Sequence, residues 1–175
     1  QKMDQNIEEK RCIAKYAASL IEPSDFVYLD AGTTTGFMID YITETSAKFV
    51  TNAVVHAQKL AARGMYVYLI GGELKGSTEA IVGSQAMNTL RNYHFTKGFF
   101  GSNGVNVAEG FTTPDASEAQ IKETALEQCK KRYVLCDASK FDNVSCVTFG
   151  EFNTATILTD ACPKGYKSYD NIVVC

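Results

Sequence analysis

The sequence has no excess of positive charge and almost no clustering of basic residues. Its 175 residues include 17 Lys and Arg against 20 Asp and Glu, which gives a net charge of −3. One basic run, Lys130 to Arg132, falls at the end of an expected helix, where cations suit the helix dipole. The chain therefore lacks the electrostatic footprint of a nucleic-acid-binding domain, and we do not expect it to hold DNA by itself.

Long hydrophobic runs and closely paired cysteines are missing as well. No apolar stretch approaches the roughly 20 residues of a membrane span, and no signal peptide is visible, so we expect a cytoplasmic protein without a membrane partner. The six cysteines form no C-x-x-C pair. Cys12, Cys129 and Cys136 stand among apolar residues, which predicts buried free thiols rather than a metal site. We expect no cofactor.

The sequence does contain enough apolar material for one domain. Hydrophobic residues make up 45% of the chain, and no linker, low-complexity stretch or internal repeat interrupts it. Residue 1 is Gln rather than Met, and a polar helical pattern follows it. We interpret the chain as part of a longer polypeptide, in which residues 1–22 form a leading helix and residues 23–175 form a single α/β domain.

Helical and strand patterns alternate along the chain. We predict helices over residues 7–21, 34–43, 53–63, 79–91 and 116–131. We predict strands over residues 26–30, 48–51, 65–70, 97–102, 133–137, 156–159 and 172–174, and a loop over 106–115. This alternation predicts an α/β fold with three layers, in which a Rossmann-like, mostly parallel sheet carries helices on both faces.

The most informative segment is a turn rich in Gly and Thr. Residues 26–29 read as a buried strand, residues 31–35 as the turn, and a helix opens after it. Such a turn presents backbone N–H groups, hydroxyls and the positive end of a helix dipole, which is the chemistry that a phosphate needs. It lacks both the Lys of a P-loop and the spacing of a dinucleotide-binding loop, which favours a smaller ligand. An ordinary helix N-cap would read the same way.

Four further strands are expected to end in small polar residues. The five strand ends are residues 30–35, 51–52, 71–74, 101–104 and 137–140. Ligands of open α/β sheets collect beyond the carboxyl ends of the strands. Glycines permit close backbone approach, hydroxyls and amides bind sugar hydroxyls, and a lysine balances a phosphate. The strand ends thus favour a pocket for a polyhydroxylated phosphate, although turns in such sheets are rich in Gly and Asn in any case.

Five motifs in register carry a resemblance to a known family. They are YLDAGTTT at 28–35, VTN at 50–52, LIGGEL at 69–74, GFTTPD at 110–115 with Glu118 and Lys122, and DASKF at 137–141. Over essentially its whole length, the chain resembles the C-terminal effector-binding domain of the DeoR family of bacterial sugar-operon repressors. It departs from the family at Thr96-Lys97, where members often carry Asp-Lys.

The resemblance implies a fold, an effector and partners. The fold would be similar to that of ribose-5-phosphate isomerase and glucosamine-6-phosphate deaminase. The effector would be a sugar phosphate such as fructose-1-phosphate or tagatose-6-phosphate, and it would modulate the binding of operator DNA by an N-terminal helix-turn-helix that this sequence lacks. The protein would be a homo-oligomer, either a dimer or a tetramer. The particular sugar, and whether it releases or tightens DNA, cannot be read from the residues.

The candidate effector-binding residues come from the strand ends and the family motifs together. We expect residues 32–35 to hold the phosphate and Lys140 to supply positive charge, while Lys122 either adds charge or pairs with Glu118 along a helix. The other candidates would face sugar hydroxyls. The full set is Asp30, Gly32, Thr33, Thr34, Thr35, Asn52, Gly71, Gly72, Glu73, Ser102, Asn103, Gly104, Thr112, Thr113, Asp115, Glu118, Lys122 and Lys140.

A sugar-phosphate isomerase or deaminase-like enzyme is the main alternative. The isomerase carries paired aspartates where this chain has Phe100 and Asn103, and neither of these can act as a general base. His56 and His94 lie outside the expected strand-end loops, so we interpret both as surface or core residues. We expect no catalytic residues and hence a sensor. A scaffold that assembles without any small molecule is a third possibility.

Overall fold

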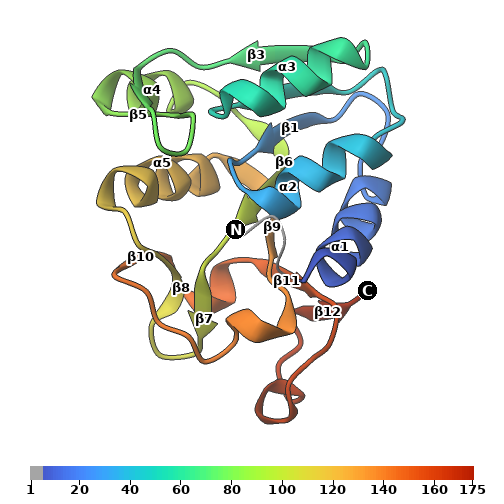
Figure 1. The fold of residues 1–175 in the computed structure, drawn as a ribbon, viewed down its shortest axis with the longest axis vertical. Helices are drawn as coiled ribbons and strands as arrows, with labels where there is room; N and C mark the ends of the chain where they lie inside the picture. Colours follow the sequence, from blue (N-terminus) through green and yellow to red (C-terminus); the bar gives the residue numbers. More distant parts are fainter. Residues whose placement is uncertain (1–5) are drawn as a thin grey trace.

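A seven-stranded parallel sheet runs through the molecule (Figure 1). The computed structural model describes residues 6–175. The strands of this sheet are β1 (Phe26–Leu29), β2 (Lys48–Thr51), β3 (Tyr66–Leu69), β6 (Phe95–Gly101), β9 (Cys129–Leu135), β11 (Thr156–Thr159) and β12 (Ile172–Val174). Their spatial order is β12-β11-β9-β6-β1-β2-β3, and every neighbouring pair is parallel. The predicted α/β class is confirmed.

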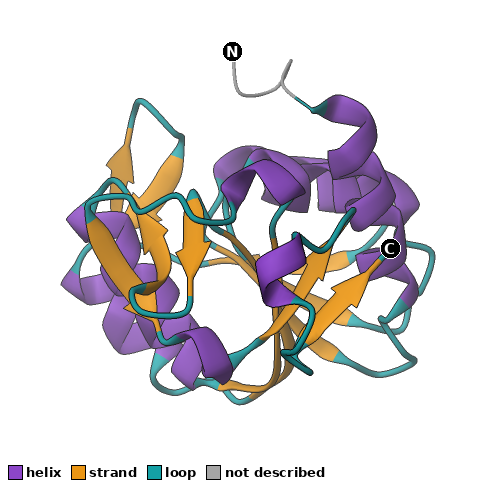
Figure 2. Cartoon of the chain, turned by 90° about the horizontal axis from the view of Figure 1, so that it is seen from below, coloured by secondary structure: helices purple, strands orange, loops and turns teal. Residues whose placement is uncertain are grey.

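Helices cover both faces of the sheet (Figure 2). The α-helices are α1 (Ile7–Ser19), α2 (Thr33–Met38), α3 (Val54–Ala62), α4 (Ser84–Leu90) and α5 (Ala116–Glu127). Short 3-10 turns are η2 (Ile39–Tyr41), η3 (Ala138–Lys140), η4 (Phe152–Thr154) and η5 (Lys164–Tyr166). Because successive strand residues point to opposite faces, Val27 and Leu29 pack in one core with α1 and α2, and Tyr28 packs in the other with α4 and α5.

Two small antiparallel sheets continue from the large one. The first is a hairpin of β4 (Glu73–Lys75) and β5 (Ala80–Val82), which follows β3. The second joins β7 (Gly104–Asn106), β8 (Gly110–Thr113) and β10 (Val147–Gly150), and it begins just after β6. Gly110 has φ 75°, and a Cβ there would overlap the carbonyl oxygen of Gly150, so both conformation and space require glycine.

The structure corrects two of the predicted elements here and adds a strand. Residues 80–82, expected at the start of a helix, pair as β5 with β4, and α4 begins only after Gly83, whose φ of 101° interrupts the chain. The expected loop over 106–115 contains a hairpin, in which Asn106 Oδ1 accepts from the amide of Glu109 at 2.6 Å. β10 was not predicted. In these short segments, pairing with another strand decides the structure more than the intrinsic preference of the residues does.

The basic run and the cysteines also differ from expectation. The helix predicted over 116–131 ends at Glu127, and Lys130 to Arg132 belong to β9, where Lys131 lies opposite Lys97 of β6. Cys129 and Cys136 are buried, as expected, and burial raises the pKa of each thiol to about 12. Cys12 is exposed, so the prediction that it is buried is wrong.

Lys97, the remaining member of the family's Asp-Lys pair, has a structural role. Its Nζ lies 2.6 Å from Asp25 Oδ2 and 2.7 Å from Glu22 Oε1. Thr96 Oγ1 donates to Asp25 Oδ1 at 2.8 Å. Thr96 therefore belongs to the same polar cluster as Lys97, Asp25 and Glu22. The cluster holds the segment that precedes β1 against β6. Across residues 6–175, no helix combines the length and the apolar character needed to cross a bilayer.

Candidate functional site

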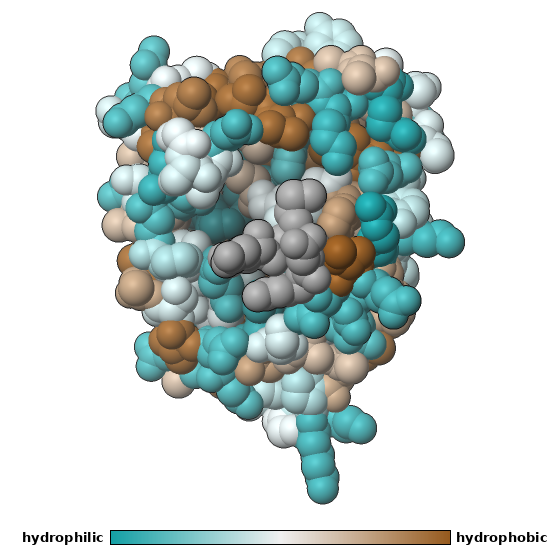
Figure 3. Space-filling view, in the orientation of Figure 1, coloured by the Kyte–Doolittle hydropathy of each residue, from teal (hydrophilic) through white to brown (hydrophobic). Residues whose placement is uncertain are grey.

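A cavity of about 440 Å³ opens where β1, β6 and β9 end. Its wall comes from Lys10 of α1, residues 31–34, the start of α3, residues 77–79, residues 101–103, Thr113, α5 and residues 135–140. Figure 3 shows this face of the molecule hollowed near its centre, with mainly hydrophilic residues around the hollow. The volume lies within the range of roughly 300–1,000 Å³ that is usual for small-molecule sites. We call it the strand-end cavity.

The Gly/Thr turn forms one wall of the strand-end cavity. Gly32 has φ 145°, a conformation that side-chain-bearing residues rarely adopt, and this brings the chain from β1 into α2. Thr33 and Thr34 line the cavity. The first amide to bond within the helix is that of Gly36, which donates to the Gly32 carbonyl at 3.1 Å, so the amides before it precede the helical ladder. The turn therefore presents both hydroxyls and amides to a ligand.

Thr35 and His56 hold the turn from behind. Thr35 Oγ1 donates to the Asp30 carbonyl at 2.6 Å, and His56 Nε2 lies 3.1 Å from both Thr35 Oγ1 and the Gly32 carbonyl. Burial lowers the pKa of His56 to about 4, so the ring is neutral at pH 7. Because a carbonyl can only accept, Nε2 carries the proton. Thr35 therefore stabilises the turn with its hydroxyl and does not line the cavity.

His56 was missed by sequence reasoning, although it lines the cavity. It lies in the first turn of α3, soon after the end of β2, and such a position is close to the carboxyl edge of a sheet. That position in the sequence could have indicated that His56 lies at the site. Gly36 allows the close approach, because a Cβ there would lie only 3.0 Å from His56 Cε1.

A buried ion pair lies at the base of the cavity. Lys122 Nζ of α5 pairs with Asp30 Oδ2 and donates to the Gly101 carbonyl at 3.0 Å, and the amide of Gly101 donates to Asp30 Oδ2 at 3.1 Å. Burial raises the pKa of Asp30, and Lys122 opposes that rise. Of the two alternatives for Lys122, the pairing with Glu118 is not formed, because Lys122 pairs with Asp30. Glu118 instead accepts from Thr78 Oγ1 at 3.3 Å.

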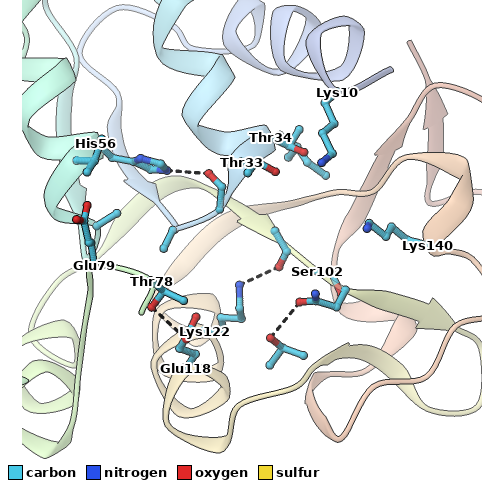
Figure 4. Close-up of a pocket in the computed structure, with 18 of the residues that line it drawn as sticks. Lys10, Thr33, Thr34, His56, Thr78, Glu79, Ser102, Glu118, Lys122 and Lys140 are labelled. Atoms are coloured by element: carbon cyan, nitrogen blue, oxygen red, sulfur yellow. Dashed lines mark hydrogen bonds between the residues drawn. The ribbon is translucent and has the colours of Figure 1, made fainter. Parts of the chain in front are cut away.

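Small polar side chains cover the part of the wall that follows β6. Ser102 Oγ donates to the Gly104 carbonyl at 2.8 Å, and Thr113 Oγ1 donates to Asn103 Oδ1 at 3.3 Å. Figure 4 shows Lys10, Thr33, Thr34 and Lys140 toward one side of the cavity and Thr78, Glu79 and Glu118 toward the other. One side of the cavity therefore carries Lys10 and Lys140, with Asp137 also in the lining, and the other side is rich in oxygen acceptors.

Half of the predicted site residues line the cavity. They are Gly32, Thr33, Thr34, Ser102, Asn103, Thr113, Glu118, Lys122 and Lys140. Their distances along the chain are large, so the parallel sheet brings them together. Lys10 lines the cavity as well and was not predicted, because an isolated lysine in a helix gives no signal in the sequence.

The other predicted residues lie outside this lining. They are Asp30, Thr35, Asn52, Gly71, Gly72, Glu73, Gly104, Thr112 and Asp115. Asn52 Nδ2 donates to the Ile81 carbonyl at 3.1 Å, and Thr112 Oγ1 accepts from the amide of Ser145 at 2.9 Å. Asp115 caps α5 by accepting from the amide of Glu118, and it lies 3.4 Å from Lys75 Nζ. Asn52, Thr112 and Asp115 thus have partners within the protein. The expectation that these nine residues contact an effector stays a prediction.

Gly104 and the segment 71–73 show why the sequence alone does not distinguish residues that line the cavity from residues that are needed for turns of the chain. A Cβ on Gly104 would lie 2.8 Å from the Asn143 carbonyl carbon, so glycine is needed there for a backbone crossing. Residues 71–73 lead from β3 into β4. In the part of the chain that the structure describes, no three His, Cys, Asp or Glu side chains are grouped as a metal site requires.

Comparison with known proteins points to one family. The model of the DeoR C-terminal sensor domain matches residues 5–161. The chain is 44% identical to the uncharacterized HTH-type transcriptional regulator FruR of Bacillus subtilis, over 99% of this chain and 70% of that protein. It is 32% identical to the lactose phosphotransferase system repressor of Streptococcus mutans, over 95% and 67%, and 35% identical to the Staphylococcus aureus repressor of that name, over 89% and 63%.

Solved structures share the fold at low identity. Ribose 5-phosphate isomerase A of Methanocaldococcus jannaschii superposes with a TM-score of 0.56 at 15% identity, over 78% of this chain and 55% of that chain. The eIF2B delta protein of Chaetomium thermophilum superposes with a TM-score of 0.59 at 17% identity, over 79% and 50%. At such identities the likeness concerns the fold alone.

Proposed function

Because the chain belongs to the DeoR family, as the C-terminal sensor domain of a transcriptional regulator, we propose that it binds a phosphorylated sugar in the strand-end cavity. The family relation makes it a sensor domain of sugar-related repressors and not an enzyme. The relative from Streptococcus mutans is named for a lactose phosphotransferase system, which connects that protein with a sugar and with phosphate transfer. To this sensor role we add the proposal that the effector is a phosphorylated sugar.

The polarity of the cavity is the observation that carries this proposal. Lys140 and Lys10 bring cationic groups to the side of the Gly/Thr turn, where Thr33 and Thr34 add hydroxyls and amides. A phosphate would bind there, because charge-assisted hydrogen bonds to its oxygens are the strong ones. Ser102, Asn103 and Glu118 then supply donors and acceptors for sugar hydroxyls.

The protonation states of the cavity support a binding role. Asp30 is held by Lys122, and the basic nitrogen of the neutral His56, Nδ1, is buried away from solvent, so neither group is placed as a general base. Phe100, which occupies one position of the isomerase aspartates, is fully buried in the core. A site with these groups can hold a sugar phosphate without transforming it.

Beyond the sensor domain, the proposal extends to the whole protein. The chain spans 63% to 70% of the length of the relatives named above. We propose that the full protein binds operator DNA through an N-terminal helix-turn-helix joined near residues 1–22, acts in the bacterial cytoplasm as a homo-oligomer, and changes its DNA affinity when the effector binds. A coupling of this kind requires an effector that distinguishes two states of the protein.

A thermal-shift panel tests the effector class. The chain would be melted with fructose-1-phosphate, tagatose-6-phosphate, inorganic phosphate and each unphosphorylated sugar. A ligand at about 100 times its Kd stabilises the folded state by about 2.7 kcal/mol, which raises the Tm of a domain this size by roughly 5–10 °C. We expect this shift for one sugar phosphate and not for its parent sugar. No shift across the panel would favour a scaffold without a ligand.

A double substitution tests where the phosphate binds. Thr33→Val with Thr34→Val removes two hydroxyls from the cavity wall while keeping the shape of the side chains, so we expect the ligand-dependent Tm shift to disappear and the ligand-free Tm to stay within a few degrees. Thr43→Val with Thr45→Val is the matched control, because both of these threonines are exposed and lie outside the cavity. A Thr33/Thr34 variant that binds like the wild type would refute the assignment of the turn.

A further inference from the structure

We propose that Lys10 is the residue through which the bound effector fixes the position of α1, the helix at the N-terminal side of the sensor domain. The inference rests on the proposed function, since it needs an anionic ligand in the strand-end cavity. It adds a physical connection between that ligand and α1, the first helix of the domain. Three sets of contacts support it.

The first is the position of Lys10 itself. Lys10 belongs to the second turn of α1, yet its side chain is 3% exposed and lines the strand-end cavity. Figure 4 shows it reaching from α1 toward Thr33 and Thr34. A phosphate held by the Gly/Thr turn and Lys140 would therefore meet an ammonium group carried by α1. Burial away from water strengthens such a charge pair.

The second set of contacts joins the start of α1 to the segment that carries Lys140. Asn6 Nδ2 donates to Asp137 Oδ1 at 3.4 Å and to Ser139 Oγ at 3.3 Å. Asp137 and Ser139 flank the beginning of η3, which ends at Lys140. The first turn of α1 thus lies against a segment of the cavity wall, and a ligand that orders this segment also orders the contacts of Asn6.

The third set packs α1 on α2, the helix that begins in the Gly/Thr turn. Ala14 and Ala17 are fully buried in one core with Phe37 and Met38 of α2, so small side chains allow the two helices to pack closely. The Arg11 guanidinium lies 4.4 Å from the centre of the Phe37 ring. Ligand contacts with the turn and with Lys10 therefore act on two helices that already pack together.

These contacts have a thermodynamic consequence. A phosphate bound between the turn, Lys140 and Lys10 touches three segments at once, and it stabilises the arrangement in which all three are close. By linkage, any state in which α1 is displaced binds the effector more weakly. The effector thereby favours one position of α1, and this position decides how the preceding residues leave the domain.

Hydrogen–deuterium exchange on the wild type tests the coupling. The probe is the sugar phosphate that gives the thermal shift, with fructose-1-phosphate used first. At saturation we expect slower exchange both in residues 31–38 and in residues 7–19. Slower exchange in 31–38 alone would overturn the inference and leave the proposed function intact. No slowing in either segment with any sugar phosphate would overturn both.

Lys10→Gln then tests the residue. We expect its affinity for the probe to fall about tenfold, as for the loss of one charge-assisted hydrogen bond. At saturating ligand, protection of 31–38 should remain and protection of 7–19 should be lost. Lys15→Gln on the same helix is the matched control, since Lys15 is exposed and outside the cavity, and it should behave like the wild type. Lys10→Arg, which keeps the charge, should recover part of the protection.

Two outcomes would overturn the role of Lys10. One is a Lys10→Gln variant that keeps both the affinity and the protection of α1. The other is found with a second variant, Asn6→Ala, which is useful if Lys10→Gln does not fold, because Asn6 is exposed. This variant should bind the probe but show weaker ligand-dependent protection in the first turns of α1. Protection equal to that of the wild type would contradict the proposed connection between the cavity wall and α1.

Discussion

At the scale of single residues, Asp30 brings a negative charge next to a site that is proposed to bind an anion. Its side chain is 2% exposed, and Lys122, at 7%, offsets the charge from α5. The pair joins β1 to α5 and the end of β6 through the amide and carbonyl of Gly101. Lys122 therefore has its charge largely engaged within the protein, and the net attraction for a phosphate comes from the other side of the cavity.

Removing Lys122 should destabilise the domain strongly. Lys122→Met leaves the Asp30 carboxylate buried without a countercharge, and breaking a buried pair in this way costs about 3–5 kcal/mol. We expect the free energy of unfolding in urea to fall by that amount. The double variant Lys122→Met with Asp30→Asn should recover much of the loss, because no uncompensated charge remains. A single variant within 1 kcal/mol of the wild type would show that the pair is not needed.

At the scale of elements, β6 and β9 pack without room for a side chain at Gly98. Gly98 of β6 lies beside Cys129, and a Cβ at position 98 would overlap Cys129 Sγ and come within 2.7 Å of Phe100 Cε1. The ring of Phe100 and the thiol thus occupy the space that a side chain would need.

Gly98→Ala should destabilise the sheet by overpacking. We expect the free energy of unfolding to decrease by about 1–3 kcal/mol, measured by urea denaturation. Gly165→Ala is the control, because a Cβ at residue 165 meets nothing within 4 Å. The interpretation would fail if both alanine variants were equally stable.

The elements that the sequence predicts correctly are those with a strong local pattern. The strand at residues 48–51 has the predicted bounds, and the strand at 26–30 differs by one residue, because both are short apolar runs followed by turn residues. The hairpins at 73–82 and 104–113 were not predicted, because each of their strands has only three or four residues, too few for a clear periodic pattern. The predicted helix ran through Gly83 and the predicted loop contained Gly110, so the pairing around these two glycines was not expected.

At the scale of the whole molecule, the site is partly predictable for a physical reason. Topology brings all carboxyl strand ends to one edge, so Thr33, Asn103 and Lys140 could be grouped without coordinates. Which way each side chain points depends on neighbours from other elements. Asp30 turns to Lys122, and Lys10 enters from a helix that precedes the sheet. These features follow from packing and have no local signal.

The stability of the domain should depend on pH through His56. Its pKa is about 4 in the folded state and about 6.5 in the unfolded chain, so the unfolded state binds the proton first as the pH falls. Protonation of His56 in the unfolded chain therefore lowers the free energy of unfolding. This decrease is absent above pH 6.5, grows as the pH falls toward 4, and reaches about 3 kcal/mol.

The comparison with His56→Gln isolates this effect. A Gln amide can replace the Nε2 donor but does not titrate, so the loss of unfolding free energy between pH 7 and 4 should be about 3 kcal/mol smaller than in the wild type. His94→Gln is the control, because His94 is exposed and its variant should follow the wild-type curve. Parallel curves for wild type and His56→Gln would exclude His56 as the cause.

The β4–β5 hairpin bears on how long a signal lasts. Its base is fixed by backbone hydrogen bonds, from the amide of Val54 to the Glu79 carbonyl at 3.0 Å and from the amide of Ile81 to the Asn52 carbonyl at 2.7 Å. Its turn, which lines the cavity, is joined to α5 through Thr78 and Glu118, a surface contact worth on the order of 1 kcal/mol. An effector that leaves past this turn must wait for the turn to move. Its residence time would then contain a delay set by the protein, and two sugars of equal affinity would share that delay.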